Sequence, residues 1–214
     1  MNTNDGMNYK RFPLGALWTN GYLFFDGEGT AFFVDPGGDP KEVLDYLTRN
    51  RLTLKAVLLT HGHLDHIAGI GAFVPLVGNE IYIAPEDAPL LSAPPEELQR
   101  ALGMECEGVG NFKTISEGEV FSLGQFEITV MATPGHTWGS VCYLVRLGEK
   151  NVLVSGDTLF AQSVGRTDLP GGDSFQLFAS LQRLATLPDN LMVFPGHGPE
   201  TTIGRERQSN PFWP

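Results

Sequence analysis

All five histidines of this chain lie in three short segments that contain glycine, and this arrangement constrains the fold more than any other feature. The segments are residues 60–66 (THGHLDH), 134–137 (PGHT) and 195–198 (PGHG). Neutral imidazole is the commonest metal ligand in proteins near neutral pH. Because no histidine is left for another purpose, the sequence predicts a fold that brings the three segments together in one metal site.

The hydrophobic pattern predicts strands and helices that alternate along the chain. Asp39 and Pro40 offer the start of a helix whose apolar positions continue to Leu52, and the last clear helix is expected at 174–187. Residues 85–110, which are rich in Pro and Glu, are expected to cover the core without joining it. Strands are expected at 20–25, 30–34, 56–59, 81–84, 120–123, 126–131, 141–145, 152–154 and 191–194.

Candidate ligands stand directly after these expected strands. His61, Asp157 and His197 each follow a short apolar strand immediately, and His136 follows one within a few residues. Strand ends of one sheet can converge on one point, and the loops that leave them carry function. Glycines beside the ligands allow the sharp turns and the free space that a metal and a substrate need.

The spacing within 60–66 indicates two neighbouring metal positions. On an irregular loop, His61 and His63 can reach one ion. Asp65 and His66 follow where we expect the chain to enter a helix at 67–73, so they would face a second position beside the first.

Residues from distant loops can complete these positions. His136 can complete the first, His197 can complete the second, and Asp157 can bridge them. Each ion would have three or four protein ligands and an open place for water, which is the pattern of catalytic and not of structural sites. Structural zinc calls for cysteine-rich ligation, and Cys106 and Cys142 are not spaced for it.

The length and the net charge of the chain limit the class of protein to which it can belong. At 214 residues the chain is expected to form one domain, 1–214, with 42% hydrophobic and 18% charged residues as in folded globular proteins. The net charge of −11 and the lack of a basic run argue against a nucleic-acid partner. No apolar stretch approaches the ~20 residues of a membrane span, and the polar opening predicts no signal peptide. We therefore expect a cytoplasmic protein with two reduced thiols.

Four segments together resemble the metallo-β-lactamase superfamily and, within it, the glyoxalase II-like (hydroxyacylglutathione hydrolase-like) hydrolases. They are 60–66, 134–137, 155–160 (SGDTLF) and 195–198, and weaker resemblance at 34–38, 165–170 and 204–212 extends it over essentially the whole chain. The resemblance implies an α+β fold, an αββα sandwich of two mixed sheets flanked by helices, with the metals at one edge. It implies one metal bound by His61, His63 and His136. It assigns the second metal to Asp65, His66 and His197, with Asp157 as the bridge.

The resemblance also implies a chemistry. Two divalent ions, zinc first with iron or manganese as alternatives, can lower the pKa of a shared water and stabilise the oxyanion that forms when it attacks a carbonyl. Asp65 can in addition orient the nucleophile as a catalytic residue. A thiol has a pKa of ~8–9 and leaves without a strong acid. The expected substrate is thus a small-molecule acyl-thiol, a thioester such as S-lactoylglutathione.

The sequence departs from glyoxalase II at the substrate-binding parts. Because the sequence stops soon after His197, we expect it to lack the helical C-terminal extension that supplies basic residues for glutathione in those enzymes. Arg166 stands where those enzymes carry a basic residue, so it can bind a substrate carboxylate, or it can pair with Asp168 and stiffen the loop. Trp138 is expected to pack beneath its loop, with a place in the pocket wall as the alternative.

Other functions of the same fold remain as alternatives. A persulfide dioxygenase-like enzyme would use one iron and redox chemistry. A lactonase would carry tyrosine at the position of Phe160, and a secreted β-lactamase would carry a cysteine ligand near 157. A non-catalytic binding module would be expected to have lost ligands. The sequence leaves open the acyl group, the thiol carrier, the metal and the oligomeric state.

Overall fold

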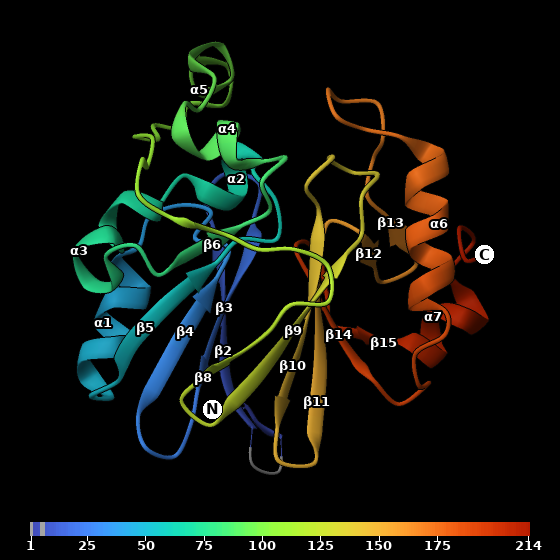
Figure 1. Ribbon diagram of the computed structural model, residues 1–214, viewed down its shortest axis with the longest axis horizontal. Coiled ribbons are helices and arrows are strands. Elements are labelled where there is room, and N and C mark those ends of the chain that lie inside the picture. Colours follow the sequence, from blue (N-terminus) through green and yellow to red (C-terminus); the bar gives the residue numbers. More distant parts are fainter. Residues whose placement is uncertain (1, 5–6) are drawn as a thin grey trace.

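The computed structural model describes residues 2–4 and 7–214, with the backbone alone for 2–4. Two β-sheets pack face to face, and helices cover the outer face of each sheet (Figure 1). This is the predicted α+β fold, an αββα sandwich of two mixed sheets. Residues 1, 5 and 6 of the polar opening, from which we expect no signal peptide, lie outside the described residues.

The first sheet has seven strands in chain order, and the pairing of its strands changes from antiparallel to parallel at its centre. Its first four strands pair antiparallel and its last four pair parallel, so β4 belongs to both kinds of ladder. The strands are β1 (Asn2–Asn4), β2 (Met7–Leu14), β3 (Thr19–Phe25), β4 (Thr30–Val34), β5 (Thr53–Leu58), β6 (Ile81–Ile83) and β7 (Lys113–Thr114).

The second sheet has the order β15-β14-β11-β10-β9-β8. Strand β14 runs parallel to β11, and β9 runs in the same direction because β10 is antiparallel to both β9 and β11. A separate short ladder, β12–β13, follows β11. The strands are β8 (Val120–Leu123), β9 (Phe126–Ala132), β10 (Val141–Leu147), β11 (Lys150–Gly156), β12 (Leu159–Phe160), β13 (Ser163–Val164), β14 (Met192–Pro195) and β15 (Thr201–Thr202).

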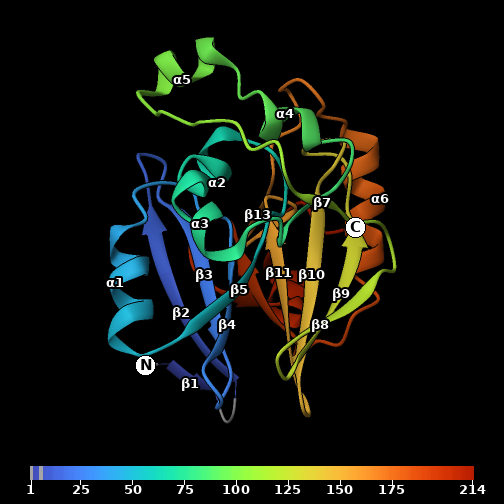
Figure 2. The same cartoon turned by 60° about the vertical axis from the view of Figure 1, so that its left-hand side comes forward.

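The helices divide between the two outer faces (Figure 1). Apolar side chains of α1 to α4 join the core of the first sheet, and those of α6 and α7 join that of the second. Figure 2 shows α4 and α5 at the same end of the sandwich as α2. The helices are α1 (Lys41–Arg49), α2 (Leu64–Ile67), the 3-10 turn η1 (Ile70–Ala72), α3 (Val74–Val77), α4 (Ala88–Ser92), α5 (Glu96–Leu102), α6 (Ser174–Leu184) and α7 (Ile203–Ser209).

Aromatic rings fill the space between the two sheets. Phe24 on β3 stacks on Phe32 of its own sheet at 5.0 Å and on Phe194 of the other at 5.9 Å. Phe126 of the second sheet meets Phe32 edge-on at 5.2 Å. Because buried aromatic side chains contribute large apolar areas, this cluster fixes the two sheets against each other and thereby the loops at their ends.

Several sequence expectations about single elements are wrong. The predicted continuous helix at 67–73 is not present, because α2 ends at Ile67 and, after Gly69, only the 3-10 turn η1 follows before α3 begins at Val74. Helix α1 ends before Leu52, and α6 ends before 187. Strand β2 was not expected, because charged residues interrupt its alternating pattern.

The segment 85–110 also differs from its prediction. Leu91, Cys106 and Val109 are buried with the core of the first sheet, so the segment contributes to the core and does not merely cover it. Both cysteines are unpaired and buried, and burial raises the pKa of each thiol to about 11. None of the helices in the described part of the chain has the length and hydrophobicity that a membrane span requires.

Candidate metal centre

The candidate ligands form neighbouring groups whose ligand atoms lie close together. The strands that precede them, from both sheets, end at one end of the sandwich (Figure 1). Strand β5 leads through Leu59 and Thr60 to His61, and β14 leads to His197. Strands β9 and β11 run in the same direction as β14 and lead to His136 and Asp157. Because these strands all deliver their carboxyl ends to this edge, segments far apart in the sequence meet there.

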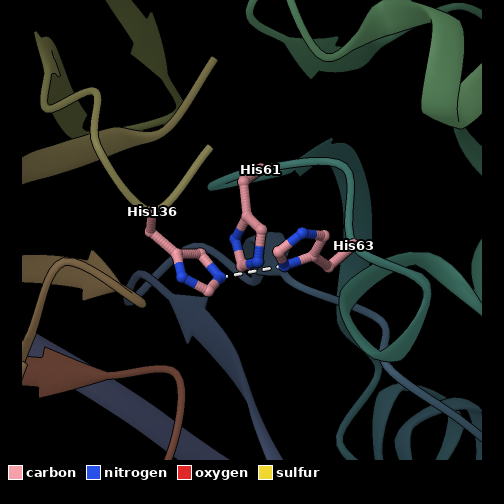
Figure 3. Close-up of side chains that lie close together, drawn as sticks. All are labelled: His61, His63 and His136. Carbon is pink, nitrogen blue, oxygen red and sulfur yellow. Dashed lines mark hydrogen bonds between the residues drawn. The ribbon is translucent and has the colours of Figure 1, made fainter. Parts of the chain in front are cut away.

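The first cluster consists of three imidazoles, His61, His63 and His136 (Figure 3). Their ring centroids lie 4.6–4.8 Å apart. The nearest approach joins His136 Nε2 to His63 Nδ1 at 2.9 Å. One ring nitrogen of each residue lies within 4.8 Å of the others, so the three could hold one metal ion.

The second cluster combines a carboxylate with two imidazoles. Asp65 and His66 lie on the short helix α2, and His197 comes from the loop after β14. Asp65 Oδ2 lies 3.3 Å from His197 Nε2 and 3.5 Å from His66 Nε2. These three side chains could hold a second ion.

Asp157 lies between the two clusters. Its Oδ1 is 3.3 Å from His66 Nε2, and its Oδ2 is 3.5 Å from His197 Nε2. The same Oδ2 is 3.6 Å from His136 Nε2, which belongs to the first cluster. The structure thus brings all seven sequence-predicted side chains together, with this carboxylate in contact with both groups.

Hydrogen bonds select which nitrogen of each ring faces the centre. The Nδ1 of His66 faces Asp35 Oδ2 at 2.9 Å, and that of His136 faces the Arg166 carbonyl at 2.8 Å. The Nδ1 of His197 faces the Leu17 carbonyl at 3.2 Å. Since carboxylate and carbonyl oxygens only accept, we assign a proton to Nδ1 in these rings, so Nε2 is the nitrogen that faces the centre and can bind a metal once it carries no proton.

A buried network around Asp35 fixes His61 in the same way. Asp35 accepts hydrogen bonds from the Thr60 backbone N–H at 2.8 Å and from the Thr60 hydroxyl at 2.7 Å. The hydroxyl has therefore already donated its proton, so at 3.0 Å it accepts from His61 Nδ1. Asp35 adopts φ 53°, a left-handed conformation uncommon for a residue other than glycine.

Sequence reasoning missed the role of Asp35. It was noted as part of the resemblance at 34–38 but not as a supporting residue. A usable signal was present, because Asp35 follows the buried strand β4 directly, just as Asp157 follows β11.

Three buried atoms of the described chain make no hydrogen bond, namely His61 Nε2, His66 Nε2 and Asp157 Oδ1. Such an unsatisfied group costs about 1–3 kcal/mol. All three belong to the candidate ligands and face the centre, where a cation would satisfy them. Imidazole and carboxylate ligands suit divalent zinc, iron or manganese, so the residues fit the implied metal pair.

Burial lowers the basicity of His61 and His63 in the first cluster. It lowers the pKa of His61 well below its usual value, and the neighbouring imidazoles His66 and His63 lower it further. The pKa of His63 falls to about 4 for the same reasons, with burial as the largest cause. Both rings are neutral at pH 7, which is the form that binds metals.

The second cluster has the opposite character. Burial lowers the pKa of His66, but Asp157, Asp65 and Asp35 together raise it well above its usual value. Burial likewise opposes the rise in the pKa of His197, which hydrogen bonds to Asp157 and Asp65 bring to about 9. Despite burial, His66 and His197 lower the pKa of Asp65 and of Asp157 below the usual carboxyl range. This part of the site favours positive charge.

Arg166 lies at the edge of the site and pairs with Asp168. Its Nε and one terminal nitrogen donate to the two Asp168 oxygens at 2.7 and 2.8 Å, and both side chains are exposed. The ion pair that the sequence offered as one alternative is therefore present. Through its backbone carbonyl Arg166 also orients His136, a contact that sequence reasoning missed.

The expectation that Trp138 packs beneath its loop is wrong, because the side chain is 63% exposed. The space under the loop is taken by buried contacts of Thr137 with Ser140 and Asp87. Trp18 is even more exposed, at 73%, and follows Leu17, whose carbonyl faces His197. Two indoles therefore stand on loops that contact the candidate ligands.

Comparison with known proteins identifies the family. The model of the metallo-beta-lactamase superfamily matches residues 15–197, so the chain belongs to this superfamily. Hydroxyacylglutathione hydrolase GloC of Haemophilus influenzae is 36% identical over 215 residues, which cover 96% of this chain and 98% of that protein.

Two crystal structures share the fold over nearly all of both chains. The BLEG-1 B3 metallo-beta-lactamase is 38% identical with a TM-score of 0.88, and the match covers 96% of this chain and 99% of that one. TTHA1623 in a di-iron-bound form is also 38% identical, with a TM-score of 0.85 and coverage of 95% and 99%. Together with the site, these relatives make the chain a hydrolase whose histidine and aspartate clusters suit divalent metal ions.

Proposed function

We propose that this protein is a binuclear metal-dependent thioester hydrolase of the hydroxyacylglutathione hydrolase type. The observation that carries the proposal is the position of Asp157, which contacts His136 of one cluster and His66 and His197 of the other. A carboxylate shared in this way fits a pair of metal ions better than a single one. The di-iron form of the related TTHA1623 supports a pair, with zinc proposed first and iron or manganese as alternatives.

His61, His63 and His136 would hold the first ion, and Asp65, His66 and His197 the second, with Asp157 between them. Two bound ions supply positive charge for a developing oxyanion and lower the pKa of water toward neutrality.

Asp65 has a second role in the proposal, as the catalytic residue that orients the attacking water. Its Oδ2 accepts a hydrogen bond from the buried Thr19 hydroxyl at 2.8 Å, which fixes the carboxylate. The pKa of Asp65 lies below the usual carboxyl range despite burial, chiefly because of His66. The group is therefore ionised at neutral pH and accepts hydrogen bonds only, as a water-orienting group must.

The disposition of the histidines favours a thiol leaving group. All five lie in the two clusters, so none remains to protonate a poor leaving group. A thiol leaves as thiolate near neutral pH because its pKa is ~8–9. The proposed substrate is therefore a small acyl-thiol. Arg166 would bind a carboxylate of this substrate after its guanidinium group separates from Asp168.

Glutathione is the thiol carrier with the most support. The related GloC is named as a hydroxyacylglutathione hydrolase, and this chain covers 98% of its length. The match therefore extends over nearly the whole of a relative with that assigned activity.

The test is hydrolysis of S-lactoylglutathione by the purified protein, with metal content measured on the same sample. We expect turnover and about two metal ions per chain. A chromogenic cephalosporin is assayed in parallel because the related BLEG-1 is named a B3 metallo-beta-lactamase. Turnover of the cephalosporin alone would contradict the thioesterase. A single iron together with oxygen uptake on glutathione persulfide would favour the dioxygenase alternative.

A further inference from the structure

We propose that Asp87 is a positioning residue for the first metal position alone, a proposal that rests on the ligation by His61, His63 and His136 put forward above. Asp87 precedes α4 in the segment 85–110, whose role the sequence left open. It is 1% exposed, although carboxylates are rarely buried so completely without a partner.

The carboxylate of Asp87 joins two ligand-bearing loops. Its Oδ2 accepts from the Gly62 backbone N–H at 2.8 Å and from the Thr137 hydroxyl at 2.8 Å. Its Oδ1 accepts from the Gly139 backbone N–H at 2.9 Å. Gly62 stands between His61 and His63, and Thr137 directly follows His136. One buried group therefore sets the distance between the two loops that deliver the three imidazoles.

Glycine is required at positions 62 and 139 because Asp87 and its helix lie so close to the backbone there. A Cβ at Gly139 would lie 2.7 Å from the Asp87 carboxyl carbon. A Cβ at Gly62 would lie 2.8 Å from the Cβ of Leu90 on α4 and 3.0 Å from the Asp87 carbonyl oxygen. The loops are thus shaped to receive this residue and its helix. Figure 2 shows α4 at this end of the molecule.

The second metal position has separate supports. His66 is oriented by Asp35, His197 by the Leu17 carbonyl, and Asp65 by Thr19. The hydrogen bonds of the Asp87 carboxylate in the described chain go to Gly62, Thr137 and Gly139 and do not reach these residues. Loss of Asp87 should therefore weaken the first position by about 10- to 100-fold, as for other partners behind metal ligands, and leave the second unchanged.

The experiment compares Asp87→Asn with Asp26→Asn. Asp26 is a matched control because it is also buried and also accepts three hydrogen bonds. In Asp26 all three come from backbone N–H groups, those of Glu28 and Thr30 on one oxygen and that of Gln125 on the other. It lies in the hairpin between β3 and β4, and its partners touch no candidate ligand. In either variant the amide supplies only one accepting oxygen, so at least one hydrogen bond is lost.

Zinc occupancy at each position is measured by anomalous diffraction from crystals equilibrated at fixed free zinc. We expect Asp87→Asn to lose zinc at the first position and keep it at the second, and Asp26→Asn to keep both. Equal loss at both positions, or no loss at either, would overturn the proposal. The measurement of zinc occupancy needs no substrate. Failure of the protein to hydrolyse S-lactoylglutathione would therefore leave the proposal for Asp87 intact. Wild-type crystals without zinc near His63 would contradict the ligation itself.

A gentler pair of variants decides the matter if Asp87→Asn does not fold. Thr137→Val removes one donor to Asp87 and keeps the shape of the side chain, whereas Thr137→Ser keeps the hydroxyl. We expect selective loss of zinc at the first position in the valine variant and full occupancy in the serine variant. Identical occupancies in both would overturn the proposal.

Discussion

The two ligand clusters are neighbours built largely from the same residue type, yet they differ in charge. His61 and His63 lie among other imidazoles, and burial lowers the pKa of each. His66 and His197 lie among carboxylates, which raise the pKa of each above its usual value despite burial. The comparison teaches that the neighbours of an imidazole decide whether a metal meets a free nitrogen or must displace a proton.

The supports of the two clusters differ as well. The loops of the first are joined by Asp87, and the Arg166 carbonyl orients His136. In the second, the Leu17 carbonyl orients His197 and the Thr19 hydroxyl fixes Asp65. The clusters should therefore respond separately to mutation, except at Asp35, whose hydrogen bonds support both His61 and His66, and at Asp157, the residue that touches both clusters.

That shared residue gives the largest expected effect. Asp157→Ala should remove metal from both positions and lower thioester hydrolysis by about 10²–10³-fold or more, because the charge that stabilises the oxyanion is lost with it. Metal content and turnover are measured on the same preparation. Asp189→Ala serves as the control, because Asp189 is an exposed carboxylate paired with Arg207. Full turnover by Asp157→Ala would rule out a bridging role.

Removal of one ligand from each cluster should separate the two positions. His136→Ala should empty the first position and His197→Ala the second, each with a loss of affinity above the ~10–100-fold seen for outer partners. Occupancy at each position is followed by anomalous diffraction. If either variant emptied both positions equally, the clusters would be one cooperative unit, and the comparison would fail.

The pH dependence of binding should follow the opposite pKa shifts. The pKa of His197 is about 9 and that of His66 is also raised, so below pH 9 a metal must displace protons from the second position. Its affinity should fall about tenfold per pH unit for each proton displaced. The pKa of His63 is about 4, so that ring stays neutral and ready to bind between pH 8 and 6. Zinc titrations at pH 8, 7 and 6 measure this, and equal slopes for both positions would contradict it.

Arg166 should give the smallest effect. Because its side chain is exposed and already paired with Asp168, Arg166→Gln should raise KM for S-lactoylglutathione by about two- to fivefold, the range of exposed ion pairs, with kcat unchanged. Arg207→Gln is the matched control, since Arg207 pairs with Asp189. A KM equal to that of the control would show that Arg166 only stiffens its loop.

Much of the fold and the candidate site could be predicted from the sequence because the signals are local. Short apolar runs predicted the strands that end at His61 and His197, and β5 and β14 lie there. The failures arise where several contacts compete. Trp138 is exposed because Thr137 and Asp87 already occupy the space beneath the loop, which no local pattern could indicate.

By itself, the sequence determined which side chains are the candidate ligands, since ligand type, spacing and the adjacent strand ends are properties of short segments. Only the tertiary structure decided which nitrogen of each ring faces the centre and which rings are protonated. Those properties depend on partners far along the chain, such as the Leu17 carbonyl, 180 residues from His197, and Asp35, 31 residues from His66. Hydrogen bonds and charge interactions act through space, and folding alone brings such partners within range.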